Sequence, residues 1–168
     1  MSDGEPAHGE RDERDRWKPG SGEFELGTDG PAVILVGVDD TVTSLRAAAY
    51  AAGLARRQHA RLVAVYVSPI TTAIGAVGAA VMVAEAEAHD ELAKELRTQF
   101  EQGIRDRGIT GTFVVTHGDP YREIKRIADE TRADAIVVGA SKQAGHRFVG
   151  SLAVRLVRAG KWPVTVVP

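Results

Sequence analysis

The chain has 168 residues, of which 43% are hydrophobic and 26% charged, and this apolar content is enough to build one compact domain. It contains no cysteine, so disulfides and thiolate metal sites are excluded and a cytoplasmic location is expected. The formal net charge of −2 gives no indication of a nucleic-acid-binding surface, although it is compatible with a small anionic ligand.

Residues 1–30 are predicted to form a disordered N-terminal tail. This segment holds nine acidic and four basic residues, so it carries a charge of −5 and leaves +3 on residues 31–168. It has too few large apolar side chains to offset the entropy of ordering the chain, and it lacks the apolar run of a secretory signal. We therefore expect residues 31–168 to form a single folded domain.

From Pro31 onward, short β-branched runs alternate with longer segments of helical periodicity. The predicted strands are Ala32–Val38, Arg61–Val67, Thr112–Thr116, Ala135–Val138 and Val164–Val167. The predicted helices are Ser44–Gln58, a long helix with an apolar stripe through Leu92, Leu96, Phe100 and Ile104, a helix capped by Asp119, and Ser151–Ala159. This alternation predicts an α/β fold with a single five-stranded parallel sheet and helices on both faces.

The segment Ile70–Ala84, between the second strand and the long helix, is rich in alanine, glycine and valine. It is shorter than the roughly 20 apolar residues that a bilayer span requires, so no membrane association is expected. Two interpretations remain open. The segment is either a lid that moves on Gly75 and Gly78, or the start of a helix that covers the core.

The position of a ligand site follows from the expected strand order, 3-2-1-4-5, in which the first and fourth strands are neighbours. Ligands of such sheets bind at the carboxyl ends of the strands, at the point where the winding changes direction. The chain leaves the first strand at Val38 and Asp39, and it leaves the fourth strand at Gly139, Ser141 and Lys142. We expect any functional site to be built from these two loops.

The second of these loops is rich in small residues and leads into a helix. Gly139, Gly145 and Gly150 would let the backbone approach an anion closely, and Ser151 begins the helix whose free N–H groups would face it. This pattern suits a phosphate group. In the alternative interpretation the glycines only permit turns and Ser151 only caps its helix.

At this loop the chain resembles the nucleotide-binding branch of the universal stress proteins. Gly139 and the pair Gly150-Ser151 match the two ends of the glycine pattern of that family. Further similarities run from Ala32 to Pro168, and they are the exit Gly37-Val38-Asp39, the strand end Val65-Tyr66-Val67, the turn Gly118-Asp119-Pro120 and the closing Lys161-Trp162-Pro163. The loop departs from the pattern twice. Lys142 replaces the second glycine, and seven residues, instead of nine, lie between Lys142 and Gly150.

The resemblance implies the fold that universal stress proteins share with adenine nucleotide alpha hydrolase-like proteins, with ATP or another adenine nucleotide as ligand. Asp39 and Val67 would hold the adenosine end, the glycine loop would hold the phosphates, and the Lys142 ammonium would replace lost N–H contacts. The residues implied in binding are Val38, Asp39, Val67, Gly139, Ser141, Lys142, Gly145, Gly150 and Ser151. The family also implies a homodimer that pairs through the last strand.

Three functional hypotheses follow: a nucleotide-binding regulatory domain, a dimeric stress module that acts through protein–protein contacts without nucleotide, and a nucleotide-hydrolysing enzyme. The enzyme is not expected, because the chain lacks a P-loop lysine and a Gly-x-Ser-x-Gly nucleophile elbow. Weak nucleotide hydrolysis stays open. His117 is expected to be an ordinary loop residue. His59, His89 and His146 lack metal-ligand spacing and are expected at the surface, so no catalytic or metal site is predicted.

Overall fold

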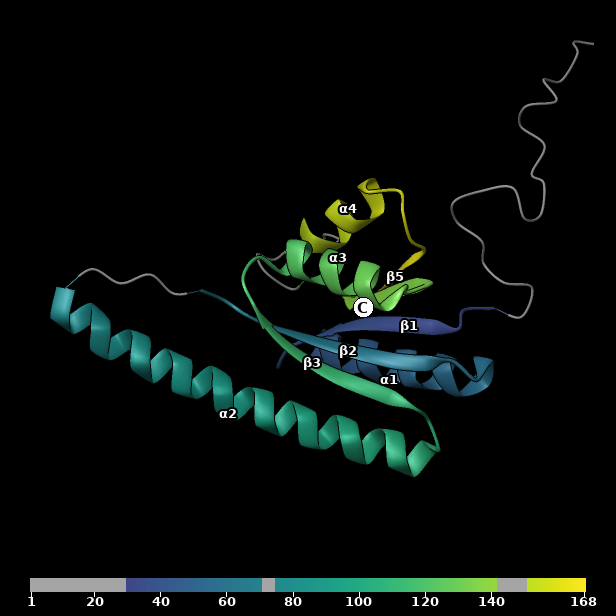
Figure 1. Cartoon of the computed structure of the whole chain (residues 1–168), viewed down its shortest axis with the longest axis horizontal. Helices are drawn as coiled ribbons and strands as arrows, with labels where there is room; N and C mark the ends of the chain where they lie inside the picture. Colours follow the sequence, from purple (N-terminus) through teal and green to yellow (C-terminus); the bar gives the residue numbers. More distant parts are fainter. Residues whose placement is uncertain (1–29, 71–74, 142–150) are drawn as a thin grey trace, which may run out of the picture.

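Figure 1 shows the computed structural model of the chain, which describes residues 30–70, 75–141 and 151–168. The predicted N-terminal tail, up to residue 29, lies outside the described residues. So do Lys142, Gly145 and Gly150 of the glycine loop.

Strands and helices alternate along the whole described chain. In chain order they are β1 (Val33–Val38), α1 (Val42–Gln58), β2 (Arg61–Ser68), α2 (Gly75–Arg107), β3 (Gly111–His117), α3 (Pro120–Thr131), β4 (Ala135–Gly139), α4 (Ser151–Arg158) and β5 (Val164–Val167). The strands form a single parallel sheet in the order β3-β2-β1-β4-β5, which confirms the predicted fold class and strand order.

Helices cover both faces of the sheet, α1 and α2 on one side and α3 and α4 on the other (Figure 1). Successive strand residues point to opposite faces, so β1 sends Ile34 and Val36 toward α1 and α2, and it sends Leu35 toward α3 and α4. All three side chains are fully buried. Two apolar cores therefore hold the helices against the sheet, as expected for parallel strands that are covered on both faces.

Side-chain caps fix where two helices begin. Thr41 precedes α1 and accepts a hydrogen bond from the backbone N–H of Ser44, so the helix starts two residues before the predicted Ser44. Asp119 caps α3 in the same way through the N–H of Arg122, and Pro120 occupies the first helical position, as predicted. Both caps lie at the carboxyl edge of the sheet, so they also shape the candidate site.

The long helix α2 already begins at Gly75, which favours the helix-start interpretation of the Ile70–Ala84 segment. The described side chains at this start do not cover the core, because Val81 is 50% and Val83 is 59% exposed. From residue 80 onward, where its side chains are described, the buried side chains of α2 are Ala93 and Leu96. In Figure 1 the N-terminal part of α2 extends past the end of the sheet. Among the described residues, none of the helices is long and apolar enough to cross a membrane.

Candidate functional site

A cleft of about 480 Å³ opens at the carboxyl edge of the sheet, where β1 and β4 lie side by side. Six of the predicted site residues line it: Val38, Asp39, Val67, Gly139, Ser141 and Ser151. The other three, Lys142, Gly145 and Gly150, fall outside the described part of the chain. The predicted switch point of the sheet is thus the place where the structure has a cleft.

The loop after β1 is held in one shape by its own hydrogen bonds. Asp39 Oδ1 accepts from the backbone N–H of Thr41 at 2.9 Å and from the Thr41 hydroxyl at 2.6 Å. The backbone N–H of Asp39 donates to Ser44 Oγ at 2.7 Å. These contacts leave Oδ2 of the exposed Asp39 without a hydrogen bond to any described residue, so this oxygen can accept one from a ligand hydroxyl.

Helix N-termini surround the cleft on several sides. Thr41 caps α1, Pro120 begins α3 and Ser151 begins α4, and all three residues line the cleft. The N-terminus of a helix carries a partial positive charge and unpaired N–H groups. Their convergence at one edge favours a negatively charged group in the cleft.

Ion pairing fixes the start of α3 against α4. Arg155 of α4 lies 3.2 Å from an Asp119 carboxylate oxygen, and its guanidinium sits 4.1 Å from the ring centre of Tyr121. The backbone N–H of Arg122, followed by the Arg155 side chain, lowers the pKa of Asp119 below its ordinary value. Asp119 therefore stays ionised at neutral pH, where it links the start of α3 to the last turn of α4.

Gly139, at the end of β4, has a structural role that the sequence did not indicate. A Cβ at this position would lie 2.6 Å from the carbonyl carbon of Thr43 and 2.6 Å from the nitrogen of Ser44. The sequence alone favours a glycine here for the approach of an anion or for a turn. The structure shows that it also permits the close approach of β4 to the first turn of α1.

Sequence reasoning missed the apolar floor of the cleft. Val65 and Val138 lie under it, and Ile124 of α3 closes one side. These side chains are at most 2% exposed, and they form an apolar part of the cleft next to the polar loops. The period-2 alternation of β2, which points Val65 and Val67 to the same face, is the signal that could have identified the floor.

The three described histidines differ in their surroundings. His59 and His117 are exposed, whereas the expectation that His89 is a simple surface residue is wrong. Its ring is half-buried and Nδ1 lies 2.7 Å from the Tyr66 hydroxyl. Burial, together with Asp40 and Asp39, raises the pKa of Tyr66, so its hydroxyl stays protonated and this contact is structural. No group of three or more His, Asp or Glu residues that could hold a metal ion occurs in the described ranges.

Comparison with known proteins places this architecture in a family. The sequence model of the universal stress protein family matches residues 32–168. A universal stress protein of Methanocaldococcus jannaschii is 29% identical over 136 residues, which cover 80% of each chain.

Solved structures agree with this assignment. A universal stress protein family structure from Burkholderia pseudomallei is 28% identical, with a TM-score of 0.64, and the match covers 84% of this chain and 98% of that one. The structure of an Archaeoglobus fulgidus universal stress protein in complex with dAMP is 26% identical, with a TM-score of 0.55, covering 80% and 96% of the two chains. The family match spans the complete sheet and both loops of the cleft. The chain therefore belongs to the universal stress protein family.

Proposed function

We propose that this universal stress protein domain is a regulatory module that binds an adenine nucleotide, ATP or a relative of it, in the cleft between β1 and β4. The observation that carries the proposal is the convergence of three helix N-termini on a cleft with an apolar floor and an open carboxylate oxygen. Such a cleft offers one end to a flat base and ribose and the other to phosphate. The dAMP complex of the Archaeoglobus fulgidus relative supports adenine as the base.

The two ends of the cleft would have different tasks. Val38 and Val67 are half-buried and would contact the adenine ring, while Asp39 Oδ2 would accept a hydrogen bond from a ribose hydroxyl. Gly139, Ser141 and Ser151 would surround the phosphates, together with Lys142, Gly145 and Gly150 from the loop between β4 and α4. No residue of the cleft is assigned a catalytic role, so the module would act by binding.

The second candidate is a dimeric stress module that acts through protein contacts, and features of the edge strand favour assembly in either case. Val164–Val167 is a half-buried outer strand without a charged residue, which is an open template for another strand. Arg46 of α1 reaches the Pro168 carbonyl beside it, and the exposed Val42 and Tyr50 lie one turn to either side of Arg46. We propose a symmetric homodimer that pairs through β5. We also propose a cytoplasmic location, because a chain without cysteine has no disulfide that would need an oxidising compartment.

The nucleotide proposal is tested with freshly purified protein. Denaturation followed by chromatography should release ATP, ADP or AMP, and calorimetric titration of the emptied protein should give a dissociation constant for each. Replacing Asp39 by Asn keeps the Oδ1 contacts with Thr41 but removes the charge that faces the ligand. We expect Asp39→Asn to weaken binding about tenfold.

Asp40→Asn is the matched control, because Asp40 is the adjacent exposed carboxylate and does not line the cleft. It should change the dissociation constant less than about twofold. Added salt should weaken binding, since part of the attraction is between charges at an exposed site. Absence of both released nucleotide and heat at millimolar nucleotide would overturn the proposal and leave the structural module as the better assignment.

A further inference from the structure

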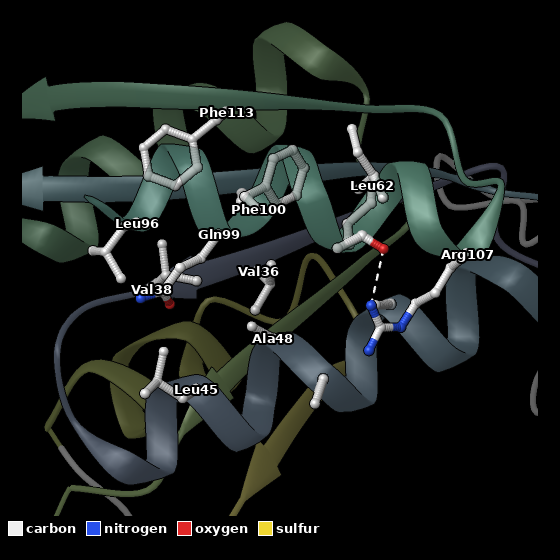
Figure 2. Close-up of a pocket in the computed structure, with 15 residues that line it drawn as sticks. Val36, Val38, Leu45, Ala48, Leu62, Leu96, Gln99, Phe100, Arg107 and Phe113 are labelled. Carbon is white, nitrogen blue, oxygen red and sulfur yellow. Dashed lines mark hydrogen bonds between the residues drawn. The ribbon is translucent and has the colours of Figure 1, made fainter. Parts of the chain in front are cut away.

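A second cavity, of about 330 Å³, lies on the opposite face of the sheet, between α1 and α2 (Figure 2). Its floor includes Val36 of β1, α2 contributes Leu96 and Phe100, and α1 contributes Ala48 and Ala52. Apart from Val38, which lines both, its lining residues differ from those of the nucleotide cleft. The universal stress protein assignment gives this cavity no role.

The cavity exists because, apart from Leu45, α1 presents only alanine methyl groups to the space beside it. Ala47, Ala51 and Ala55 are fully buried against the sheet, and the neighbouring Ala48 and Ala52 are half-buried at the cavity. Large side chains extend from α2 instead, and they contact β3, where the ring centres of Phe100 and Phe113 lie 5.7 Å apart. The space between the two helices opens to solvent, since Leu45 is 43% exposed and both Gln99 and Arg107 are exposed, so a ligand can enter it and cover its apolar walls.

One end of the cavity carries a positive charge. Arg107, at the end of α2, lines it, and Figure 2 places this residue at the end opposite to Leu96. Its one hydrogen bond with a described residue goes from Nη1 to the Gly103 carbonyl at 2.9 Å, one turn earlier in the same helix. Among the described residues Arg107 has no ion pair. Its guanidinium can therefore still form a bidentate contact with a carboxylate.

We propose that this cavity binds a medium-chain fatty acid of about eight to ten carbons, with the carboxylate on Arg107 and the alkyl chain between α1 and α2. The cation at one end and the apolar walls along the rest call for a ligand with an anionic head and an apolar chain. The size agrees, because an apolar cavity of about 150 Å³ accommodates benzene and this one has roughly twice that volume. Gln99 is the second polar residue of the lining, and its amide donates to Glu95 at 3.0 Å.

The first test is a chain-length series on the full-length protein. Hexanoate, octanoate and decanoate are titrated by calorimetry below their micelle concentrations, together with 1-decanol. Each added methylene should tighten binding up to about fourfold until the cavity is full, and decanol should bind about tenfold more weakly than decanoate because it lacks the charge. Absence of saturable binding, or affinity that does not depend on the carboxylate, would overturn the proposal.

The second test locates the site with two variants and their controls. Ala48→Leu fills the cavity and should weaken decanoate binding at least tenfold, whereas Ala86→Leu, the same change at an exposed position of α2 outside the cavity, should leave it unchanged. Arg107→Gln should weaken decanoate about tenfold and decanol less than twofold. Arg105→Gln, which removes a charge from the same helix end outside the cavity, is the control.

Thermal melting of each variant confirms that it is folded before binding is compared. Equal weakening by Ala48→Leu and Ala86→Leu would place the ligand elsewhere and overturn the proposal. Another occupant would overturn it as well. A mass that falls from dimer to monomer on Ala48→Leu, without fatty-acid binding, would show a second copy in the cavity. Amide shifts of residues 1–29 on Ala48→Leu, without fatty-acid binding, would show that the N-terminal segment occupies the cavity.

Discussion

The contact between Gly139 and the first turn of α1 shows how one residue serves both fold and site. No side chain fits at position 139, because a Cβ would lie 2.6 Å from backbone atoms of Thr43 and Ser44, and backbone cannot rotate away. The sequence placed Gly139 correctly at the end of a strand and at the edge of the cleft. Its packing role could not be predicted, since that depends on how closely α1 approaches β4.

We therefore expect Gly139→Ala to lower the free energy of unfolding by about 3 kcal/mol, at the upper end of overpacking costs. Gly53→Ala on α1 is the matched control. There a Cβ meets only the mobile end of Arg57 at 3.4 Å, and alanine favours the helix, so stability should rise by up to about 1 kcal/mol. Urea denaturation measures both values. A Gly139→Ala protein as stable as the wild type would contradict the close approach.

At the scale of elements, a polar network joins the end of β3 to α3. Glu123 Oε2 accepts from the Thr116 hydroxyl at 2.6 Å and lies 2.7 Å from Arg126, which also pairs with Glu130 at 2.8 Å. The Glu123 side chain is only 19% exposed. Arg126 first, and then Thr116, lower the pKa of Glu123.

A lowered pKa means that the folded state binds the Glu123 proton less tightly than the unfolded state does. The stability that ionised Glu123 gives the folded state is therefore present above the ordinary carboxyl pKa, and it is lost as the pH falls through the lowered pKa of the folded state. We expect Glu123→Gln to cost roughly 1 kcal/mol at pH 7, and the difference from wild type to shrink below about pH 5. Glu130→Gln, at a side chain that is 55% exposed, should cost less than about 0.5 kcal/mol. A pH-independent difference would show that Glu123 acts through packing alone.

Helix α2 marks the limit of what periodicity predicts about an element. The stripe through Leu92, Leu96 and Phe100 correctly identified the packed half, because those side chains repeat at helical spacing and contact the sheet. The residues of α2 before Leu92 show no such stripe, so the sequence could not distinguish a helix that starts at Gly75 from a loop. The exposure of Val83 follows from the position of the sheet's end, which is a property of the whole fold.

At the scale of the molecule, the strand order was predictable because alternating strands and helices with right-handed crossovers allow few arrangements. The position of the cleft followed from the order alone, and six of the nine predicted residues line it. The cavity between α1 and α2 did not follow, since alanine-rich helices signal burial without indicating how far apart two helices lie. Volume between elements depends on packing, which local pattern does not encode.

Assembly through β5 would place the same strand of two copies side by side. Backbone pairing of two β5 strands about a two-fold axis would bring equivalent residues close together, so a lysine on this strand would face its own copy. Thr165 is half-buried and is absent from both apolar cores, so Thr165→Lys should disturb the fold little. By light scattering well above micromolar concentration, we expect wild type at twice the chain mass and Thr165→Lys shifted to monomer. Thr112→Lys on the opposite edge strand, β3, should remain dimeric, because the β3 edge takes no part in the proposed interface. A wild type that is monomeric, or an equal shift from dimer to monomer in both variants, would show that β5 is not the interface.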